Sequence, residues 1–374
     1  MKYEKDDVIT IAKRDNNNKR PFLLVNPLQG KHLAVSPSKS IELFQTLAHQ
    51  VFSHTDIDYA NTLIIGFAET ATAIGAGLAI NAPFAVSYIQ TTREQYPEKE
   101  FLYFSEEHSH ATDQMVIKDF LDETLKQGFH ILFAEDEVTT GKTIENFIQV
   151  LQKTYSSYHL TFGIASILNG MGEEKLQQLK ERNIMVDYLF AVPSYDYQSI
   201  LDNYTYEPEL RHIAAEVSIP YQTLLCDGYE NTRLGVAAPA YQTACEHLAE
   251  QVMHQLPCNQ NTPLDILILG TEECMYPGIA LGAYIETHSN HQVRFHATTR
   301  SPILPSKEED YPIRERYCLH SFYEQERTTY LYNVAACDLC IVVTDTPVTT
   351  TAMDELCSIL KDKVKGNILL VNWR

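Results

Sequence analysis

The order of apolar and polar segments predicts an α/β fold built on a mainly parallel sheet flanked by helices. Short apolar runs, typical of buried strands, alternate with stretches whose apolar residues have helical spacing. Parallel neighbours need a crossover connection, usually a helix, so this alternation favours a parallel sheet. The unusual polar residues follow directly after the apolar runs, which is where such sheets bind their ligands.

The first elements each have a local signal. Residues 21–27 (PFLLVNP) form a short apolar run and predict a strand, and residues 41–52 have helical spacing with Ser40 as a cap. Residues 61–67 (NTLIIGF) predict a buried strand. The small residues of 68–82 suit a helix whose start lets a ligand approach closely.

The pattern continues through the first half of the chain. PFAVSYIQTTR and FLYFSEEHSH each hold a strand-like core that ends in polar residues, and residues 116–128 predict a helix. Residues 129–153 repeat the theme of apolar strand, polar loop and helix. Strands at 159–168 and 186–193 lie on either side of a charged helix.

Length and spacing predict two domains. Residues 1–20 are a polar lead that we expect to be mobile or loosely attached, and residues 21–236 form the first domain. Residues 237–263 form a connecting helix and linker, in which 239–256 is helical. A second α/β domain covers residues 264–374 and begins with the strand LDILILG.

Charge and cysteine usage exclude several classes of protein. The 374 residues include 29 Lys and Arg against 49 Asp and Glu, a formal net charge of −20. Such a chain is a poor partner for nucleic acid or an anionic membrane. No apolar run reaches membrane-spanning length, and no secretory signal is visible. All eight cysteines lie beyond residue 225, so we expect a reduced, cytoplasmic protein.

The main chemical motif is ILFAEDEVTTGKT, residues 131–143. A loop at a helix N-terminus offers backbone N–H groups to a phosphate, and Gly141 permits close approach. The hydroxyls of the neighbouring threonines add donors, whereas Glu135 and Asp136 suit sugar hydroxyls. A phosphorylated sugar satisfies both halves. The loop is not a Walker A motif, because the upstream glycine is absent. The alternative is a surface helix cap beside an incidental acidic pair.

This motif resembles the signature of type I phosphoribosyltransferases that binds 5-phosphoribosyl 1-diphosphate (PRPP). In that signature an apolar strand leads into two acidic residues, two variable residues and [DT]-T-G-x-[ST]. The resemblance implies that Glu135 and Asp136 bind the ribose hydroxyls. It also implies that the 5′-phosphate lies among Thr139, Thr140, Gly141, Lys142 and Thr143. One departure is Glu137, where the family usually has an apolar residue.

Two further loops fit the same family. The small-residue turn from Gly66 to Ala71 follows a strand, and its backbone N–H groups suit a diphosphate, with tight packing as the alternative. The residues assigned to the pyrophosphate side are Ala68, Glu69, Thr70 and Arg93. The mobile loop of the family corresponds to residues 90–114. Its string EEHSH offers His108 or His110 as a proton donor or an organiser of Mg²⁺, or is a plain polar loop tip.

The remaining metal signals are weaker. Zinc binding at the EEHSH string is disfavoured, because no cysteine lies near. The CDLC string, residues 337–340, lies in a strand-like run and is interpreted as core rather than as a metal or redox site.

The pieces together resemble the phosphoribosyltransferase-like proteins of tellurite-resistance (ter) operons. The segments that show this resemblance are RPFLLVNPLQGKH, GFAETA, TTR, EEHSHA, FAEDEVTTGKT and DGYENTRLG. The stretch around Thr299, Arg300 and Ser301 resembles the TRSP domain that follows that catalytic domain. These three residues are the candidate ligand site of the second domain. The resemblance covers most of the chain but does not supply the substrate.

The second domain repeats signals of the first. LIIGFAET, YIQTTREQYP and HILFAEDEVTTGKTIENF resemble LILGTEEC, FHATTRSPIL and LCIVVTDTPVTTTAMDEL in the same order. We therefore expect a diverged copy, with generic convergence as the alternative. Asp345 is placed opposite Glu135, Thr346 replaces Asp136 and Thr351 replaces Gly141. The copy should bind a different phosphate-bearing ligand, or only pack, and should not use PRPP.

The sequence thus predicts a phosphoribosyltransferase that uses PRPP and Mg²⁺, transfers to a nucleobase-like acceptor and releases pyrophosphate. Its partners would be small molecules, PRPP and the acceptor, with no nucleic acid and no membrane. The alternative is a non-catalytic sensor of PRPP or a nucleotide on the same fold. The acceptor, the direction of the reaction and the oligomeric state, a homo-oligomer included, stay open.

Overall fold

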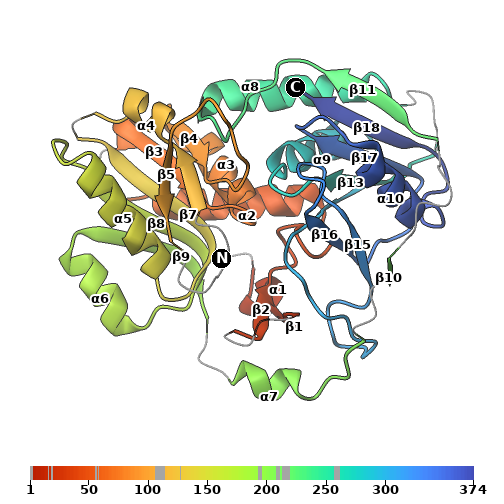
Figure 1. Ribbon diagram of the computed structural model, residues 1–374, viewed down its shortest axis with the longest axis horizontal. Helices are drawn as coiled ribbons and strands as arrows, with labels where there is room; N and C mark the ends of the chain where they lie inside the picture. The colour runs from red at the N-terminus through yellow and green to blue at the C-terminus, as the bar shows by residue number, and fades with distance from the viewer. Residues whose placement is uncertain are drawn as a thin grey trace. The chain divides into compact units, whose positions relative to one another are not determined.

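The computed structural model describes most of the chain (Figure 1). The described residues are 3–15, 17, 20–54, 57, 59–105, 114–126, 128–192, 196–207, 211–212, 220–256 and 262–374. Within these ranges, every helix is too short or too polar to cross a lipid bilayer.

The chain divides into two compact units, each described by itself below. The central unit comprises Glu42–Ser194 and Glu230–Thr243, and the terminal unit comprises Met1–Ile41, Tyr195–Tyr229 and Ala244–Arg374. The division falls inside helices α2 (Pro37–Val51) and α8 (Ala238–Met253).

The units are therefore not the continuous stretches that the sequence predicts. Residues 21–41 and 195–229, which the prediction places in the first domain, belong to the terminal unit. One reason is that strands far apart in the sequence pair with each other. Strand β11 (Gln222–Cys226) pairs in parallel with β18 (Ile368–Trp373) at the edge of the terminal sheet.

The central unit is built on a six-stranded sheet of order β12-β4-β3-β7-β8-β9. The strands from β4 to β9 are parallel, β12 is antiparallel to β4, and β5 and β6 form a separate antiparallel pair. The strands are β3 (Thr62–Gly66), β4 (Ser87–Gln90), β5 (Phe101–Phe104), β6 (Gln114–Ile117), β7 (His130–Val138), β8 (Thr161–Asn169), β9 (Ile184–Ala191) and β12 (Val236–Ala237). The helices are the 3₁₀ turn η1 (Tyr59–Asn61), α3 (Thr72–Ile80), α4 (Lys118–Thr124), α5 (Lys142–Thr154) and α6 (Glu173–Glu181).

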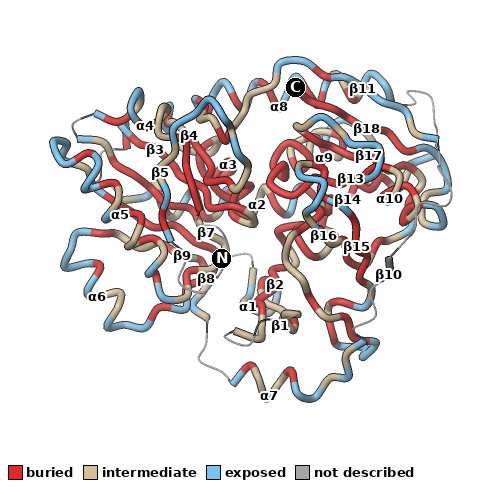
Figure 2. Tube along the Cα trace, viewed as in Figure 1, coloured by how far each residue is buried: buried red, intermediate tan, exposed pale blue. Residues whose placement is uncertain are grey.

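Helices flank this sheet (Figure 1), and alternating residues of β3 and β7 point to its opposite faces. A Cβ on Gly75 of α3 would lie 2.8 Å from the Cα of Gly66, so small residues let this helix approach one face. On the other face Phe133 packs on Phe147 of α5, which also stacks on Phe104 at 4.0 Å. Both layers exclude water, and β3 is buried along its whole length (Figure 2).

The terminal unit is built on a five-stranded parallel sheet of order β11-β18-β17-β13-β14. A second sheet of order β10-β15-β16 and the antiparallel pair β1-β2 complete its strands. The strands not yet bounded are β1 (Thr10–Lys13), β2 (Phe22–Val25), β10 (Arg211–His212), β13 (Asp265–Gly270), β14 (Gln292–Ala297), β15 (Arg316–His320), β16 (Thr328–Tyr332) and β17 (Leu339–Thr344). The helices are α1 (Lys5–Val8), α7 (Tyr197–Leu201), α9 (Tyr276–His288) and α10 (Thr350–Leu360).

Two expectations about local structure are wrong. The described part of the polar lead is ordered, because Ala12 of β1 is fully buried against Leu23 and Val25 in an apolar cluster. The predicted helix at 116–128 begins at Lys118 and is shorter, because its first apolar residues form β6 and pair with β5. A short apolar run does not by itself distinguish a strand from a helix.

The cysteines of the CDLC string lie in the core, as predicted. Cys337 and Cys340 are buried in the cluster that β13, β17 and α10 share. Burial raises the pKa of the Cys337 thiol to about 11 and also raises that of Cys340. Both thiols are therefore unreactive at neutral pH.

Candidate functional site

The turn between β7 and α5 is built on a glycine in the left-handed region. Gly141 has φ 76° and ψ 0° and directly precedes α5. A Cβ at this position would lie 2.8 Å from Sδ of Met171, so the backbone angle and the space both favour glycine. Among the described side chains none caps the helix, and the Lys142 amide donates to the Thr140 hydroxyl at 3.3 Å. The first turn of α5 therefore presents N–H groups and a positive dipole end, which suit a phosphate.

The residues of this turn differ in their exposure to solvent. Thr140 and Lys142 are exposed, whereas Thr139 and Thr143 are half-buried and Gly141 is buried. These five residues form the turn after β7 and the start of α5, which is where the sequence predicts them.

The acidic pair lies inside β7 rather than in the loop after it. The strand continues to Val138 because β8 runs beside it, with Glu135 opposite Ser166 and the Gly170 amide donating to Val138 O at 2.7 Å. Successive residues of a strand point to opposite faces, so the half-buried carboxylates of Glu135 and Asp136 flank the strand near its carboxyl end.

The loop between β3 and α3 is held by a ring of hydrogen bonds around Ala68. Its amide donates to the Thr91 hydroxyl at 2.8 Å, and its carbonyl accepts from Gln114 Nε2 at 2.9 Å. The Thr91 hydroxyl donates in turn to Gln114 Oε1. The peptide bond between Ala68 and Glu69 is cis. Sequence reasoning missed Gln114, because no local signal marks a buried amide that lies 46 residues along the chain.

The register of the sheet brings these loops to one edge. Gly66 at the end of β3 lies opposite Gln90 on β4 and opposite Ala134 on β7. The three strands are parallel, so the segments that follow them leave the sheet at the same carboxyl edge. Half-buried Arg93 follows β4 there. The predicted residues that share this edge are Ala68, Glu69, Thr70, Arg93, Glu135, Asp136, Thr139, Thr140, Gly141, Lys142 and Thr143.

The two candidate proton donors cannot be placed. His108 and His110 lie in residues 106–113, outside the described residues. Their catalytic role stays a prediction.

The candidate site of the terminal unit faces carboxylates of the same chain. Thr299 is buried, and its amide donates to Tyr330 O at 2.9 Å. Arg300 donates through Nη2 to Glu273 at 2.8 Å, and its Nε lies 3.8 Å from Glu272. Ser301 is half-buried, and its amide donates to the Thr299 hydroxyl at 3.1 Å. Arg300 of this candidate ligand site thus lies beside two buried acids.

The predicted second copy has the strand order of the first. The terminal order β14-β13-β17-β18-β11 matches the central order β4-β3-β7-β8-β9, and all neighbours in both series are parallel. The register corrects the predicted alignment by one residue. Gly66 lies opposite Ala134 and Gly270 lies opposite Val343, so Asp345 corresponds to Asp136 rather than to Glu135.

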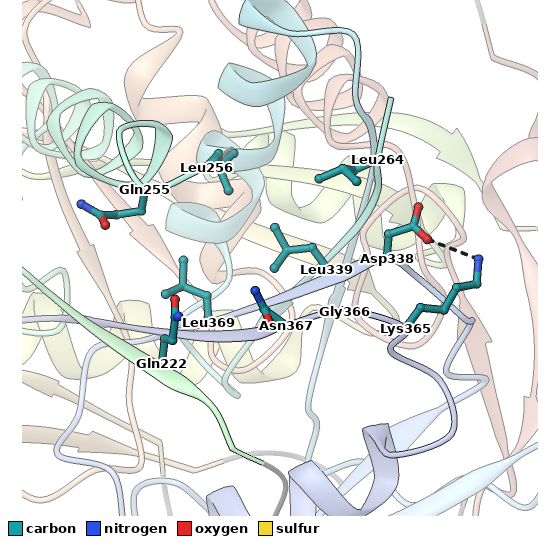
Figure 3. A pocket seen from close by; sticks show the side chains of 10 residues that line it. All are labelled: Gln222, Gln255, Leu256, Leu264, Asp338, Leu339, Lys365, Gly366, Asn367 and Leu369. Carbon is teal, nitrogen blue, oxygen red and sulfur yellow. Dashed lines mark hydrogen bonds and ion pairs between the residues drawn. The ribbon is translucent and has the colours of Figure 1, made fainter. Parts of the chain in front are cut away.

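A pocket of about 320 Å³ lies at the other edge of the terminal sheet (Figure 3). Its lining residues Gln222, Leu339 and Leu369 lie at the beginning of β11, β17 and β18. Parallel sheets bind ligands at the opposite, carboxyl edge. The two charged lining groups also pair with each other, Lys365 with Asp338 at 3.2 Å (Figure 3). This pocket therefore does not belong to the candidate site.

The oxygen-rich side chains at the central edge fit a magnesium ion that arrives with a diphosphate. Mg²⁺ prefers oxygen ligands and often takes one or two carboxylates together with substrate phosphates. Glu69, Glu135 and Asp136 supply carboxylates at this edge. Among the described residues no group of three His, Cys, Asp or Glu side chains is arranged to hold a metal. The ion would therefore depend on the diphosphate for most of its ligands.

An α/β protein with ligand-binding loops at the carboxyl edge of a parallel sheet is the class that this fold and site define. Residues 8–192 match the family model described as phosphoribosyl transferase, and residues 230–360 match the TRSP domain that follows that transferase. The chain therefore belongs to this phosphoribosyltransferase family and carries its TRSP domain, as the sequence predicts.

Solved structures give distant likenesses. An adenine phosphoribosyltransferase from Rhodothermus marinus is 17% identical, with a TM-score of 0.35, over 50% of this chain and 96% of that chain. The enzyme from Saccharomyces cerevisiae is 14% identical, with a TM-score of 0.31, over 49% of this chain and 94% of that chain. That from Trypanosoma brucei, in complex with AMP, pyrophosphate and ribose-5-phosphate, is 13% identical with a TM-score of 0.34, over 48% and 75%. Likenesses at this level do not bear on the substrate. No curated protein matches the chain.

Proposed function

We propose that this phosphoribosyltransferase takes its ribosyl group from PRPP, transfers it to a nucleobase-like acceptor and releases pyrophosphate. The observation that carries the proposal is the left-handed Gly141 turn at the N-terminus of α5, directly after an acidic pair on β7. That arrangement offers a phosphate site and sugar-hydroxyl acceptors within one segment.

Each group of residues has one task in this proposal. Glu135 and Asp136 accept hydrogen bonds from the ribose hydroxyls. The turn from Thr139 to Thr143 holds the 5′-phosphate. Glu69, Thr70 and Arg93 bind the diphosphate, and His108 or His110 gives it a proton. Ala68 positions this loop, because its amide and carbonyl are bonded to Thr91 and Gln114.

The reaction breaks the bond between ribose C1 and the diphosphate oxygen as an acceptor nitrogen forms a bond to C1. The acceptor nitrogen loses its proton, which balances the proton given to the diphosphate. The transition state is expected to resemble an oxocarbenium ion, as in glycoside hydrolysis. Glu69, Glu135 and Asp136 are the carboxylates near which a Mg²⁺ ion bound with the diphosphate would lie, and the ion would supply positive charge that stabilises the leaving group. The residues of the chain mainly orient the sugar and its two phosphate ends, so positioning supplies most of the catalysis.

The residues that follow β3 and β4 favour the enzyme over a sensor. A protein that only senses PRPP is expected to keep the phosphate turn and to have a damaged pyrophosphate loop. Here Glu69, Thr70 and Arg93 follow β3 and β4 at the carboxyl edge of the sheet. The cytoplasmic location and the link to tellurite resistance remain predictions of the sequence alone.

The test combines binding with turnover. PRPP and Mg²⁺ are titrated into the purified chain by calorimetry, and pyrophosphate release is assayed against a panel of bases. Asp136→Asn should abolish release without unfolding the protein, because the ribose loses an ionised acceptor. Glu137→Gln is the matched control, since the family tolerates an apolar residue there, and it should remain active. Full activity of Asp136→Asn would contradict the proposal, whereas binding without release from any base would favour the sensor.

A further inference from the structure

The two copies of the fold hold their first loop with equivalent hydrogen bonds. In the central unit the Ala68 amide donates to the Thr91 hydroxyl at 2.8 Å. In the terminal unit the Glu272 amide donates to the Thr298 hydroxyl at 3.0 Å. Thr91 N donates to Gly66 O at 2.9 Å, and Thr298 N donates to Gly270 O at 3.0 Å. Glu272 therefore occupies the place of Ala68.

The loop assigned to the diphosphate differs sharply between the copies. Glu272 and Glu273 are 1% and 2% exposed, although each carries a carboxylate. Glu272 lies 3.1 Å from Arg327 and accepts from the Ser321 hydroxyl, and Glu273 accepts from Arg300 at 2.8 Å. Buried carboxylates need such partners. The anions that meet the arginines in this copy are thus side chains of the protein itself.

The position assigned to the ribose is also engaged by the chain. Asp345 corresponds to Asp136 by register, and its carboxylate accepts from the Tyr229 hydroxyl at 3.0 Å and from the Tyr323 hydroxyl. In the proposed reaction, ribose hydroxyls donate to Asp136. Two tyrosine hydroxyls make the corresponding bonds in the terminal unit.

The phosphate turn has lost its special geometry. Gly141 precedes α5 with φ 76°, whereas Thr349 precedes α10 with φ −77° and ψ 141°. The terminal loop enters its helix through ordinary extended backbone, which any residue adopts. The left-handed turn that lets N–H groups approach a phosphate in the central unit is therefore missing at this helix.

We infer that the terminal copy is a self-occupied site, in which the chain's own carboxylates and tyrosine hydroxyls replace a diphosphate and a ribose. The inference rests on the proposed function for the identity of the replaced ligand. Its consequence is that one chain binds one PRPP, in the central unit, and that the terminal contacts stabilise the fold. Arg300 then serves to neutralise buried acids rather than to bind a ligand.

The first test counts binding sites. Calorimetry with PRPP and Mg²⁺ should give one site per chain for the unaltered protein and for Asp345→Asn, with affinities within twofold of each other. Asp136→Asn, the matched change in the central copy, should weaken the one site by at least about tenfold. Two sites in the unaltered protein, or a site lost in Asp345→Asn, would overturn the inference while the proposed function stands. Absence of binding in every protein would instead contradict the proposed function.

The second test needs no ligand. Trp373, the only tryptophan of the chain, is buried in the terminal unit and lies 5.2 Å from the Tyr229 ring, so its fluorescence reports urea unfolding of this unit. Tyr323→Phe and Asp345→Asn should each lower the folded-to-unfolded ratio by about tenfold, and the double variant by little more than one of them.

The control for coupling is Tyr317→Phe. Its hydroxyl donates to Glu315 at 3.0 Å in the same unit, so its effect should add to that of Asp345→Asn. Additive effects for Tyr323 and Asp345, or no effect of either, would show that the tyrosine does not hold the carboxylate. That result would overturn self-occupancy whatever PRPP does.

Discussion

The central and terminal units share one sheet topology and differ at the residues that would meet a ligand. Both keep a glycine at the end of β3 or β13, and in both a threonine hydroxyl accepts from an amide of the loop that follows that strand. These groups connect two neighbouring loops in each copy, and their hydrogen bonds form without a substrate. The left-handed glycine and the paired acids occur only in the central copy, at Gly141, Glu135 and Asp136. The comparison thus separates what the topology requires from what the chemistry requires.

The largest effect should follow from loss of the left-handed turn. Gly141→Ala forces a Cβ against Met171 and costs about 1–2 kcal/mol for the backbone angle alone. With the phosphate contacts also displaced, PRPP affinity should fall by at least about 100-fold. Thr349→Ala, at the residue that precedes α10 as Gly141 precedes α5, should leave affinity unchanged. Calorimetry measures both, and equal losses would contradict the separation of roles.

The parts of this molecule that could be predicted from the sequence are those with local signals. The AEDEVTTGKT segment combines strand end, acids and helix start within a few residues, and it lies where predicted. The repeat was visible because its strand and loop residues recur in order. The predicted alignment is off by one residue because it matches the threonines before the two helices, whereas the strand register pairs Asp345 with Asp136.

What the sequence could not show depends on contacts between distant segments. Strand β11 completes the terminal sheet from before β13, whereas β9 completes the central sheet from after β8. No local pattern in the sequence predicts that the edge strand of the terminal sheet comes before the other strands of that sheet. The same holds for Gln114 and Lys31, whose partners lie 46 and 241 residues away. The buried acids of the terminal loop resemble surface residues until their arginine partners are placed.

The next largest effect should come from a buried lysine of the terminal copy. Lys31 is 1% exposed, and its Nζ donates to Glu272 O at 2.8 Å and to Thr298 O at 3.1 Å. Lys31→Met leaves two buried carbonyls without this donor, at a cost of about 3 kcal/mol in unfolding free energy. Exposed Lys39→Met is the control and should change stability by less than about 0.5 kcal/mol. Trp373 fluorescence in urea measures both. A Lys31 variant as stable as its control would show that the carbonyls do not depend on the lysine.

Each copy also contains a buried histidine that makes the fold sensitive to acid. Burial lowers the pKa of His130 and of His296 to about 4. In the unfolded chain a histidine takes up its proton near pH 6.5, whereas the folded protein resists protonation until about pH 4. Stability is therefore complete above pH 6.5 and is lost as the pH falls, by about 2 kcal/mol per histidine at pH 5.

The measurement compares urea unfolding at pH 7.5 and pH 5. His296→Gln should reduce the loss of unfolding free energy between pH 7.5 and pH 5 that Trp373 reports for the terminal unit. His130→Gln should leave that signal unchanged, and hydrogen exchange should show its effect in the central unit. An unaltered pH dependence in His296→Gln would assign the acid sensitivity to other groups.

The smallest expected effect is the one that tests the pyrophosphate loop most directly. Gln114 donates to the Ala68 carbonyl in the central copy, and Lys31 donates to the corresponding Glu272 carbonyl in the terminal copy. Gln114→Met keeps the length of the side chain but loses both hydrogen bonds that the side-chain amide makes, to Thr91 and to Ala68. Affinity for pyrophosphate should therefore fall about tenfold. Affinity for ribose 5-phosphate should stay within twofold, because its turn at Gly141 is held by other groups. Gln149→Met, an exposed change in the same unit, should alter neither. Equal losses for both ligands would mean that Gln114 supports the whole unit, and the two loops would then not be separable by a single hydrogen bond.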